Sequence, residues 1–356
     1  MFLLVAIIGL GLIIFIHEFG HFIAGKLMGL KVKEFMFGLP GPRIFSFRMG
    51  ETEYGATAVP FGGYVKFAGV ESELQLEEDD EDKDTPPERK YDTQPRWKKA
   101  IIMFAGPLMN LIFPVVLIAA ILVGQGAPSN VNVIGEISKG SPADQVGLKK
   151  GDRILSVDGK KTKTWTDIVK NLRSKPGKQV AIVVKRDDRT LTFKPTLQNK
   201  NGRGFLGISI SYKKLAPHIA LYRGLIATAE ITKFMIVTLF VVITQKIGLL
   251  VKESAGPVMI VHQSAKVAEQ SLWQYVWFLG LISINIGIVN LLPIPPLDGG
   301  RLAVLGVEST LRRPINKRVS FIINAIGMAL LLTLMVYFVF SDIAKIIQGV
   351  SFPGGG

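Results

Sequence analysis

The stretch IFIHEFGHFIAG, Ile14–Gly25, places two histidines and one glutamate inside an apolar run near the N-terminus. The sixteen residues before the first histidine carry no charge, so Met1 to about Met28 is expected to form a membrane-spanning helix. The run lacks the basic start and the small-x-small cleavage site of a signal peptide, so we expect the helix to be retained. Ionisable groups are costly inside a span, and their clustering here indicates a functional site.

The spacing of the two histidines suits a metal ion. Residues four apart lie on one face of a helix, so His17 and His21 can direct imidazole nitrogens at one cation. Glu18 lies beside that face but points away from ligation, which is where a general base acting on water is needed. Alternatively, the helix ends at His17 and the cluster faces water, but the apolar FIAG after His21 argues against this.

A catalytic zinc site needs a third protein ligand and an open position. The chain has no cysteine, so this ligand must be His, Asp or Glu, and the two remaining histidines, His218 and His262, are poorly placed. Asp298 is the better candidate, in the segment NIGIVNLLPIPPLDGGR, Asn285–Arg301. Its prolines break the helix, and unwound backbone at membrane depth lines a cavity or is buried in protein. Taken alone, PPLDGG reads better as a turn at the membrane surface.

Four segments are apolar and long enough to span a membrane, which predicts a polytopic α-helical membrane protein with four transmembrane helices. They are Met1 to about Met28 and, approximately, residues 100–123, 272–292 and 319–340. A further segment, Gly224–Leu250, is apolar but carries three charged residues. His17 and Asp298 must reach the same depth, which requires an odd number of crossings between the soluble domain and Asp298. We therefore expect Gly224–Leu250 to be an amphipathic or interfacial helix.

Two polar regions of different character separate the first two spans. Residues 45–67 alternate apolar and polar side chains between glycines, which predicts a β-hairpin over about 43–68. The acidic run that follows, within residues 71–92, has the composition of a solvated linker. We therefore assign residues 1–124 to an N-terminal membrane part.

Residues 125–215 have the pattern of an inserted α/β domain. GSPADQVGLKKGDRILSVDG, Gly140–Gly159, resembles a PDZ domain of the bacterial protease type, with helices opening at Ser141-Pro142 and over about 165–172. PDZ domains bind an extended peptide along a sheet edge. The segment GFLGI resembles the loop that receives the C-terminus of the peptide, although an ordinary edge strand explains it equally well. Its residues are Gly204, Phe205, Leu206, Gly207 and Ile208.

Much of the positive charge of the chain lies in this domain. Ala127–His218 contains 19 Lys and Arg against seven Asp and Glu. Such an excess suits either nucleic acid or an anionic membrane surface. No nucleic-acid motif accompanies it, so we expect membrane lipid as a partner and no nucleic acid.

The motifs HEFGH and NLLPIPPLDGG together resemble the site-2 protease family of intramembrane zinc metalloproteases, peptidase family M50, and above all its bacterial branch of sigma-E regulatory proteases. The resemblance implies one Zn²⁺ ion bound by His17, His21 and Asp298, with Glu18 as the catalytic glutamate. It implies that Asn290, and more weakly Asn285, holds the substrate.

The same resemblance extends to other parts of the chain. GPLMN, residues 106–110, matches a motif for close packing beside the site, and the β-hairpin corresponds to one thought to pair with unwound substrate. The implied substrate is a single-pass membrane protein, an anti-sigma factor already cut by another protease, and also remnant signal peptides. The single PDZ domain departs from relatives that have two.

Basic residues indicate the orientation. Five Arg and Lys against one Glu follow Asp298 before the last span, and such an excess marks the cytoplasmic side. We therefore expect a bacterial plasma-membrane protein with its active site toward the cytoplasm and with the PDZ domain and both termini outside. Residues 216–271 form the interfacial helical region in this scheme, and residues 272–356 form the C-terminal membrane part.

Two other functions fit parts of the pattern. A non-catalytic membrane scaffold could display the PDZ domain, but it has no need for His17, Glu18, His21 and Asp298 together. A metal transporter needs ionisable groups along a path, whereas here they cluster at one depth.

Overall fold

The computed structural model describes residues 1–59, 62–69, 84–245 and 255–348. The chain forms two compact units, which are described separately. One comprises Met1–Ala119 with Leu221–Gly356, and the other comprises Ala120–Ala220. The second unit contains the expected PDZ region.

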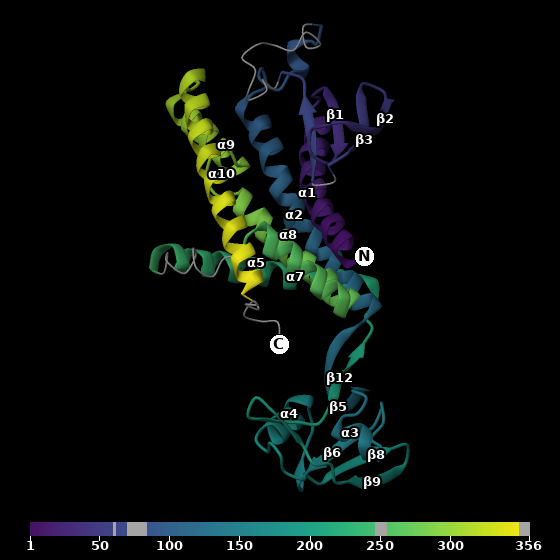
Figure 1. Ribbon diagram of the computed structural model, residues 1–356. Coiled ribbons are helices and arrows are strands. Elements are labelled where there is room, and N and C mark those ends of the chain that lie inside the picture. Colours follow the sequence, from purple (N-terminus) through teal and green to yellow (C-terminus); the bar gives the residue numbers. More distant parts are fainter. Residues whose placement is uncertain (60–61, 70–83, 246–254, 349–356) are drawn as a thin grey trace. The chain divides into compact units, whose positions relative to one another are not determined.

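Within the described residues, five helices are long and apolar enough to cross a membrane (Figure 1). They are α1 (Phe2–Leu27), α2 (Arg96–Gly124), α5 (Pro217–Gln245), α8 (Leu272–Asn290) and α10 (Lys317–Ile347). Four of them overlap the spans expected from the sequence.

Helix α5 differs from our expectation. It covers most of the segment assigned to an interfacial helix, and residues 246–250 of that segment lie outside the described part of the chain. By length and composition α5 qualifies as a fifth candidate span, because it contains a strongly apolar 18-residue stretch with no more than two charged residues. The count of four spans rested on a depth argument alone and is not confirmed.

A short helix, α7 (Pro257–Gln270), packs against α1, α8 and α10. Asp342 of α10 is fully buried and accepts hydrogen bonds from the backbone N–H groups of Gly256, at 3.0 Å, and Met259, at 2.9 Å. It therefore caps the N-terminus of α7 from another helix. Residues Leu10 and Ile13 of α1 form a buried cluster with Tyr275 and Leu279 of α8.

The expected hairpin is part of a four-stranded sheet. The strands are β1 (Val32–Phe37), β2 (Arg43–Met49), β3 (Thr52–Thr57) and β4 (Gly63–Phe67), in the order β2-β3-β1-β4. The hairpin is β2–β3, β1 lies parallel to β3, and β4 is antiparallel to β1. The sheet lies beside the C-terminal half of α1 (Figure 1). There the ring of Phe35 of β1 stacks on the ring of Phe22, with 4.6 Å between the ring centroids. The sequence reading missed β1, because VKEFMF does not alternate cleanly.

Part of the end of the acidic run packs against the sheet, although most of its residues are exposed. Residues 71–83 lie outside the described part of the chain, but residues 84–92 are described and contain the buried side chain of Thr85. The Tyr91 backbone N–H donates to the carbonyl of Ala68, just after β4, at 2.8 Å. Residues 84–92 are therefore partly packed, because the sheet end offers backbone and apolar partners that composition does not reveal, and the linker assignment of residues 71–92 stays a prediction.

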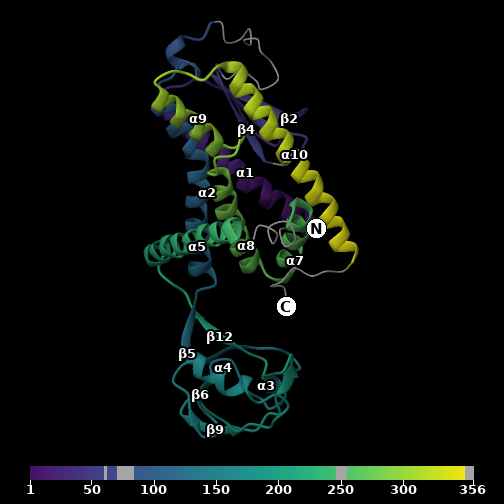
Figure 2. The same cartoon turned by 90° about the vertical axis from the view of Figure 1, so that its left-hand side faces the viewer.

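The second unit is a PDZ-like β domain (Figure 2). Its sheet contains β5 (Ala127–Ile137), β6 (Arg153–Val157), β8 (Ile182–Arg186), β9 (Arg189–Phe193) and β12 (Ile208–Lys213), ordered β12-β5-β6-β8-β9, with β7 (Lys160–Lys161) on β6. A hairpin, β10 (Gln198–Lys200) and β11 (Arg203–Phe205), precedes β12. Helices α3 (Pro142–Gln145) and α4 (Trp165–Arg173) begin where the sequence predicts, because Ser141 and Thr164 cap them.

The chain between α8 and α9 (Asp298–Leu311) is not helical, as the prolines predict. Helix α8 ends at Asn290, and α9 begins at Asp298 itself. Gly299 and Gly300 let the start of α9 approach the backbone of the preceding loop, because a Cβ at Gly300 would lie 2.7 Å from the Ile294 carbonyl. This turn returns Asp298 toward the membrane helices.

Candidate metal centre

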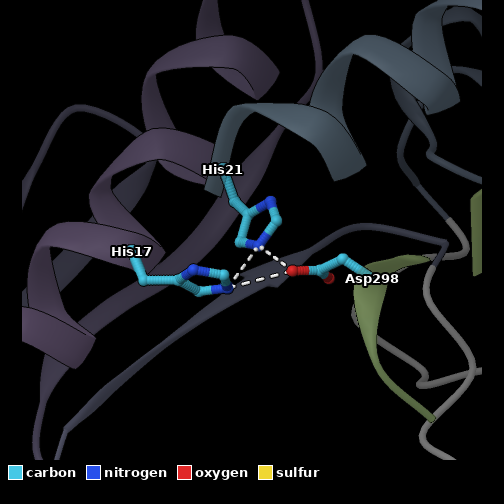
Figure 3. A group of neighbouring side chains, drawn as sticks. All are labelled: His17, His21 and Asp298. Atoms are coloured by element: carbon cyan, nitrogen blue, oxygen red, sulfur yellow. Dashed lines mark hydrogen bonds and ion pairs between the residues drawn. The ribbon is translucent and has the colours of Figure 1, made fainter. Parts of the chain in front are cut away.

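Two buried histidines of α1 face one carboxylate (Figure 3). The Oδ2 atom of Asp298 lies 3.0 Å from His17 Nε2 and 3.4 Å from His21 Nε2. The two Nε2 atoms are themselves 3.2 Å apart. The structure therefore brings together the three residues that the sequence suggested as ligands.

This donor set fits a zinc ion. Ligand atoms of a tetrahedral zinc site, each about 2.0–2.1 Å from the metal, lie about 3.4 Å apart. The three separations above are close to that value. Three groups that offer lone pairs would repel one another at these distances without a cation between them or protons on the histidines.

The outer nitrogen of His21 supports the same assignment. Its Nδ1 lies 2.7 Å from the carbonyl oxygen of Ile102 on α2. A carbonyl can only accept, so Nδ1 carries the proton and Nε2 of the neutral ring keeps its lone pair for a metal.

Close packing of α1 against α2 makes this contact possible. A Cβ at Gly106 would lie 2.9 Å from Cε1 of His17 and closer still to the His21 ring. A Cβ at Gly20 would lie 2.7 Å from the Ala105 carbonyl carbon. The two glycines allow the two helices to approach closely where the histidines lie.

The sequence profile of peptidase family M50 matches residues 5–334. The chain belongs to this family. It is 30% identical to the regulator of sigma-W protease RasP of Bacillus subtilis, over 96% of this chain and 97% of that protein. It is 28% identical to the zinc metalloprotease RasP of Geobacillus kaustophilus, over 95% of this chain and 97% of that protein.

One solved structure matches a limited part of the chain. The PDZ domain of the SdrC-like protein of Listeria monocytogenes is 25% identical, and the match covers 24% of this chain and 90% of that chain, with a TM-score of 0.21. Together with the family match, the relatives make this chain an M50 zinc metalloprotease, a homologue of RasP that performs intramembrane proteolysis.

The metal site of this M50 protease opens into a cavity of about 310 Å³. Glu18 and Asn290 line it beside the three candidate ligands, as do Val65 and Phe67 of β4. Glu18 is half-buried and interacts with the backbone of Val65. The cavity therefore contains a carboxylate next to the ligands and a strand along one wall.

Other predicted site residues are placed elsewhere. Asn285 is exposed on α8 and does not line the cavity. His218 begins α5, and His262 lies on α7, so neither belongs to the ligand cluster. In the PDZ-like domain, Gly204 and Phe205 end β11, Leu206 and Gly207 form the turn, and Ile208 begins β12, which is consistent with either reading of GFLGI.

Two polar residues of the cavity were not predicted from the sequence. Tyr91 and Arg301 both line the cavity. Burial raises the pKa of Tyr91 to about 12, so its hydroxyl stays protonated and can donate a hydrogen bond. Arg301 lies three residues after Asp298 and was available from the motif, whereas Tyr91 follows the acidic run, where no pattern indicates a site.

Proposed function

We propose that this M50 protease cleaves single-pass membrane proteins within or near their spans, and that its principal substrate is an anti-sigma factor already shortened by another protease. Remnant signal peptides would be a second substrate class. The observation that carries the proposal is the convergence of Asp298 on His17 and His21 beside Glu18, within a unit built from candidate membrane spans. The relative named for regulation of sigma-W supports the substrate class.

The three candidate ligands and Glu18 would share the chemistry of peptide hydrolysis. Zinc held by His17, His21 and Asp298 would polarise the scissile carbonyl and lower the pKa of a water molecule. Glu18 would take the proton from the attacking water and pass it to the leaving amine nitrogen. This assignment requires a carboxylate next to the ligands that is not itself a ligand, and Glu18 satisfies it.

Strand β4 would hold the substrate. Helical peptide bonds are shielded, so a membrane-spanning substrate must be locally extended before attack. Within the described residues, β4 lies at one end of the sheet order with only β1 beside it, and its Val65 and Phe67 face the cavity. An extended peptide could add to this edge, and Asn290 could hold its freed backbone groups.

The PDZ-like domain would receive a peptide C-terminus exposed by the first cut. Strand β12 also lies at one end of its sheet order, and GFLGI leads directly into it. A positive φ of 84° at Gly207 gives this turn a conformation that favours glycine. The protein would lie in a bacterial plasma membrane, with the PDZ-like domain outside the cytoplasm and the metal site toward the cytoplasmic side.

The role of Glu18 is tested with Glu18→Gln in the purified full-length protein. This variant keeps the size of the side chain but loses the base, so we expect one equivalent of zinc and no cleavage of a single-pass substrate on a gel. Glu230→Gln, on the exposed face of α5, is the matched control and should cleave normally. Cleavage by Glu18→Gln at the wild-type rate would refute the assignment, and wild-type protein without stoichiometric zinc would favour the scaffold.

A further inference from the structure

Asn110 is a buried polar residue beside the metal centre that the mechanism above does not use. It lies on α2, its exposed fraction is 0%, and it is not among the residues that line the cavity. Its Nδ2 atom lies 3.4 Å from Nδ1 of His17, while its Oδ1 atom is buried without a hydrogen-bond partner. A buried amide oxygen without a partner is costly and requires an explanation.

The tautomer of a neutral, metal-binding His17 ring indicates which atom of this amide should face it. If Nε2 of His17 binds the metal, the neutral ring carries its proton on Nδ1, which then needs an acceptor. An amide N–H pointing at this Nδ1–H is the wrong partner. The oxygen and nitrogen of an amide are nearly indistinguishable in shape, so a half-turn of the side chain places Oδ1 where Nδ2 stands. That orientation pairs Oδ1 with the Nδ1–H group.

The neighbouring amide of Asn290 is less suited to this role. Its Nδ2 atom is 3.5 Å from both Nδ1 and Nε2 of His17, so this amide does not distinguish the two ring nitrogens. Asn290 also lines the cavity, whereas Asn110 is enclosed by protein.

The two histidines are then held in the same way by one face of α2. His21 donates to the carbonyl of Ile102, and His17 would donate to Asn110, two helical turns further along. Gly106, halfway between them, leaves room for both rings. Residues four apart share a helix face. The face of α2 toward α1 therefore carries the Ile102 carbonyl, then the glycine that leaves room for the rings, and then the Asn110 side chain.

Helix α8 holds Asn110 in place from the other side. The Ser283 hydroxyl donates to the Asn110 backbone carbonyl at 2.8 Å. One turn later, Gly287 allows α8 to approach, since a Cβ there would lie 3.2 Å from the Asn110 Cβ. Asn110 is thus held by its own helix α2 and by α8, and its side chain contacts His17 on α1.

We propose that Asn110 is a positioning residue whose Oδ1 accepts a hydrogen bond from His17 Nδ1–H and so directs Nε2 at the metal. The proposal rests on the metal site of the proposed function. It also explains why an asparagine, rather than an apolar residue, lies in the interior of the helix bundle at the end of GPLMN.

The test compares two substitutions in the full-length purified protein by competition of a chelator for Zn²⁺. Asn110→Asp keeps an acceptor and, as the ionised carboxylate, cannot donate, so its zinc affinity should equal or exceed that of the wild type. Asn110→Leu removes the acceptor and should weaken zinc binding by about 10–100-fold, the usual effect of losing a partner of a liganding histidine. The visible spectrum of bound Co²⁺ should change in Asn110→Leu and not in Asn110→Asp.

The outcomes separate this proposal from the proposed function. Gln274→Leu, at an exposed amide side chain of α8 far from any assigned role, is the control and should bind zinc normally. Loss of affinity in Asn110→Asp would overturn the proposal even if Asn110→Leu fails to fold, because it would show that donation by the amide matters. Wild-type affinity in Asn110→Leu would also overturn it. Wild-type protein that binds zinc but cleaves no membrane substrate would refute the proposed function alone.

Discussion

Oδ2 of Asp298 lies 3.0 Å from Nε2 of His17, although the two residues belong to opposite ends of the chain. The contact depends on the end of α8 at Asn290, a non-helical turn, and a new helix that begins with Asp298. The metal centre is therefore assembled only when the first and the later helices pack together, so metal binding and bundle assembly are coupled.

Asp298→Ala should weaken zinc binding by about 100-fold. The binding free energy of a structural zinc site is roughly 10–16 kcal/mol, and its ligands share it at about 3 kcal/mol each. Chelator competition on the purified protein measures this loss. Asp188→Asn, a fully exposed carboxylate of the PDZ-like domain, is the control. Equal zinc affinity in Asp298→Ala and wild type would remove Asp298 from the ligand set.

Gly106→Ala should disrupt the site although it alters no charged or liganding group. The added Cβ would collide with both histidine rings, and overpacking of this kind costs about 1–3 kcal/mol. We expect reduced zinc affinity and slower cleavage. Gly306→Ala on α9 is the matched control, because a Cβ there meets nothing within 4 Å, and alanine favours a helix by up to about 1 kcal/mol. Normal zinc binding in Gly106→Ala would contradict the packing argument.

The PDZ-like domain should lose stability in acid through Asp152. Burial by itself would raise the pKa of Asp152, but two 2.7 Å hydrogen bonds from Arg186 outweigh it and hold the pKa below its usual range. A lowered native pKa stabilises the fold above the unfolded value of about 3.9, and this contribution disappears as the pH falls through the native pKa.

Asp152→Asn should therefore destabilise the domain by about 2 kcal/mol at neutral pH, the usual worth of hydrogen bonds to a charged group. Amide hydrogen exchange of β6 and β8 in the full-length protein measures the loss. The difference from wild type should shrink as the pH falls below about 4. A difference that is independent of pH would show that the charge of Asp152 does not matter.

The absence of cysteine makes the orientation directly testable. Asp188 of the PDZ-like domain and Arg312 after α9 are both exposed, so each can be replaced by a single cysteine that a reagent can reach. With α5 on the membrane surface, an impermeant maleimide should label Asp188→Cys in intact spheroplasts and Arg312→Cys only after lysis. Labelling of both positions from the same side would instead make α5 a complete crossing and contradict the count of four spans.

Local patterns account for what sequence reading predicted correctly. The spacing of His17 and His21, the capped helix α4 and the proline break before Asp298 each depend on a few neighbouring residues. Strand β1 and the packing of residues 84–92 were missed because their stability comes from partners distant in sequence. The interfacial expectation for residues 224–250 followed from a depth argument about distant residues, whereas the length and composition of α5 make it a candidate span.

The sequence by itself determined the chemistry of this protein: a two-histidine helix with an adjacent glutamate, a proline-broken segment with an aspartate, and a PDZ-like domain between candidate spans. Only the tertiary structure decided that Asp298 meets both Nε2 atoms, that Gly106 makes room for them, and that Asn110 stands behind His17. The physical reason is the distance along the chain between the residues that interact. Helical spacing is set by covalent geometry over a few residues, whereas the position of a ligand contributed by another helix depends on how side chains of the whole bundle pack.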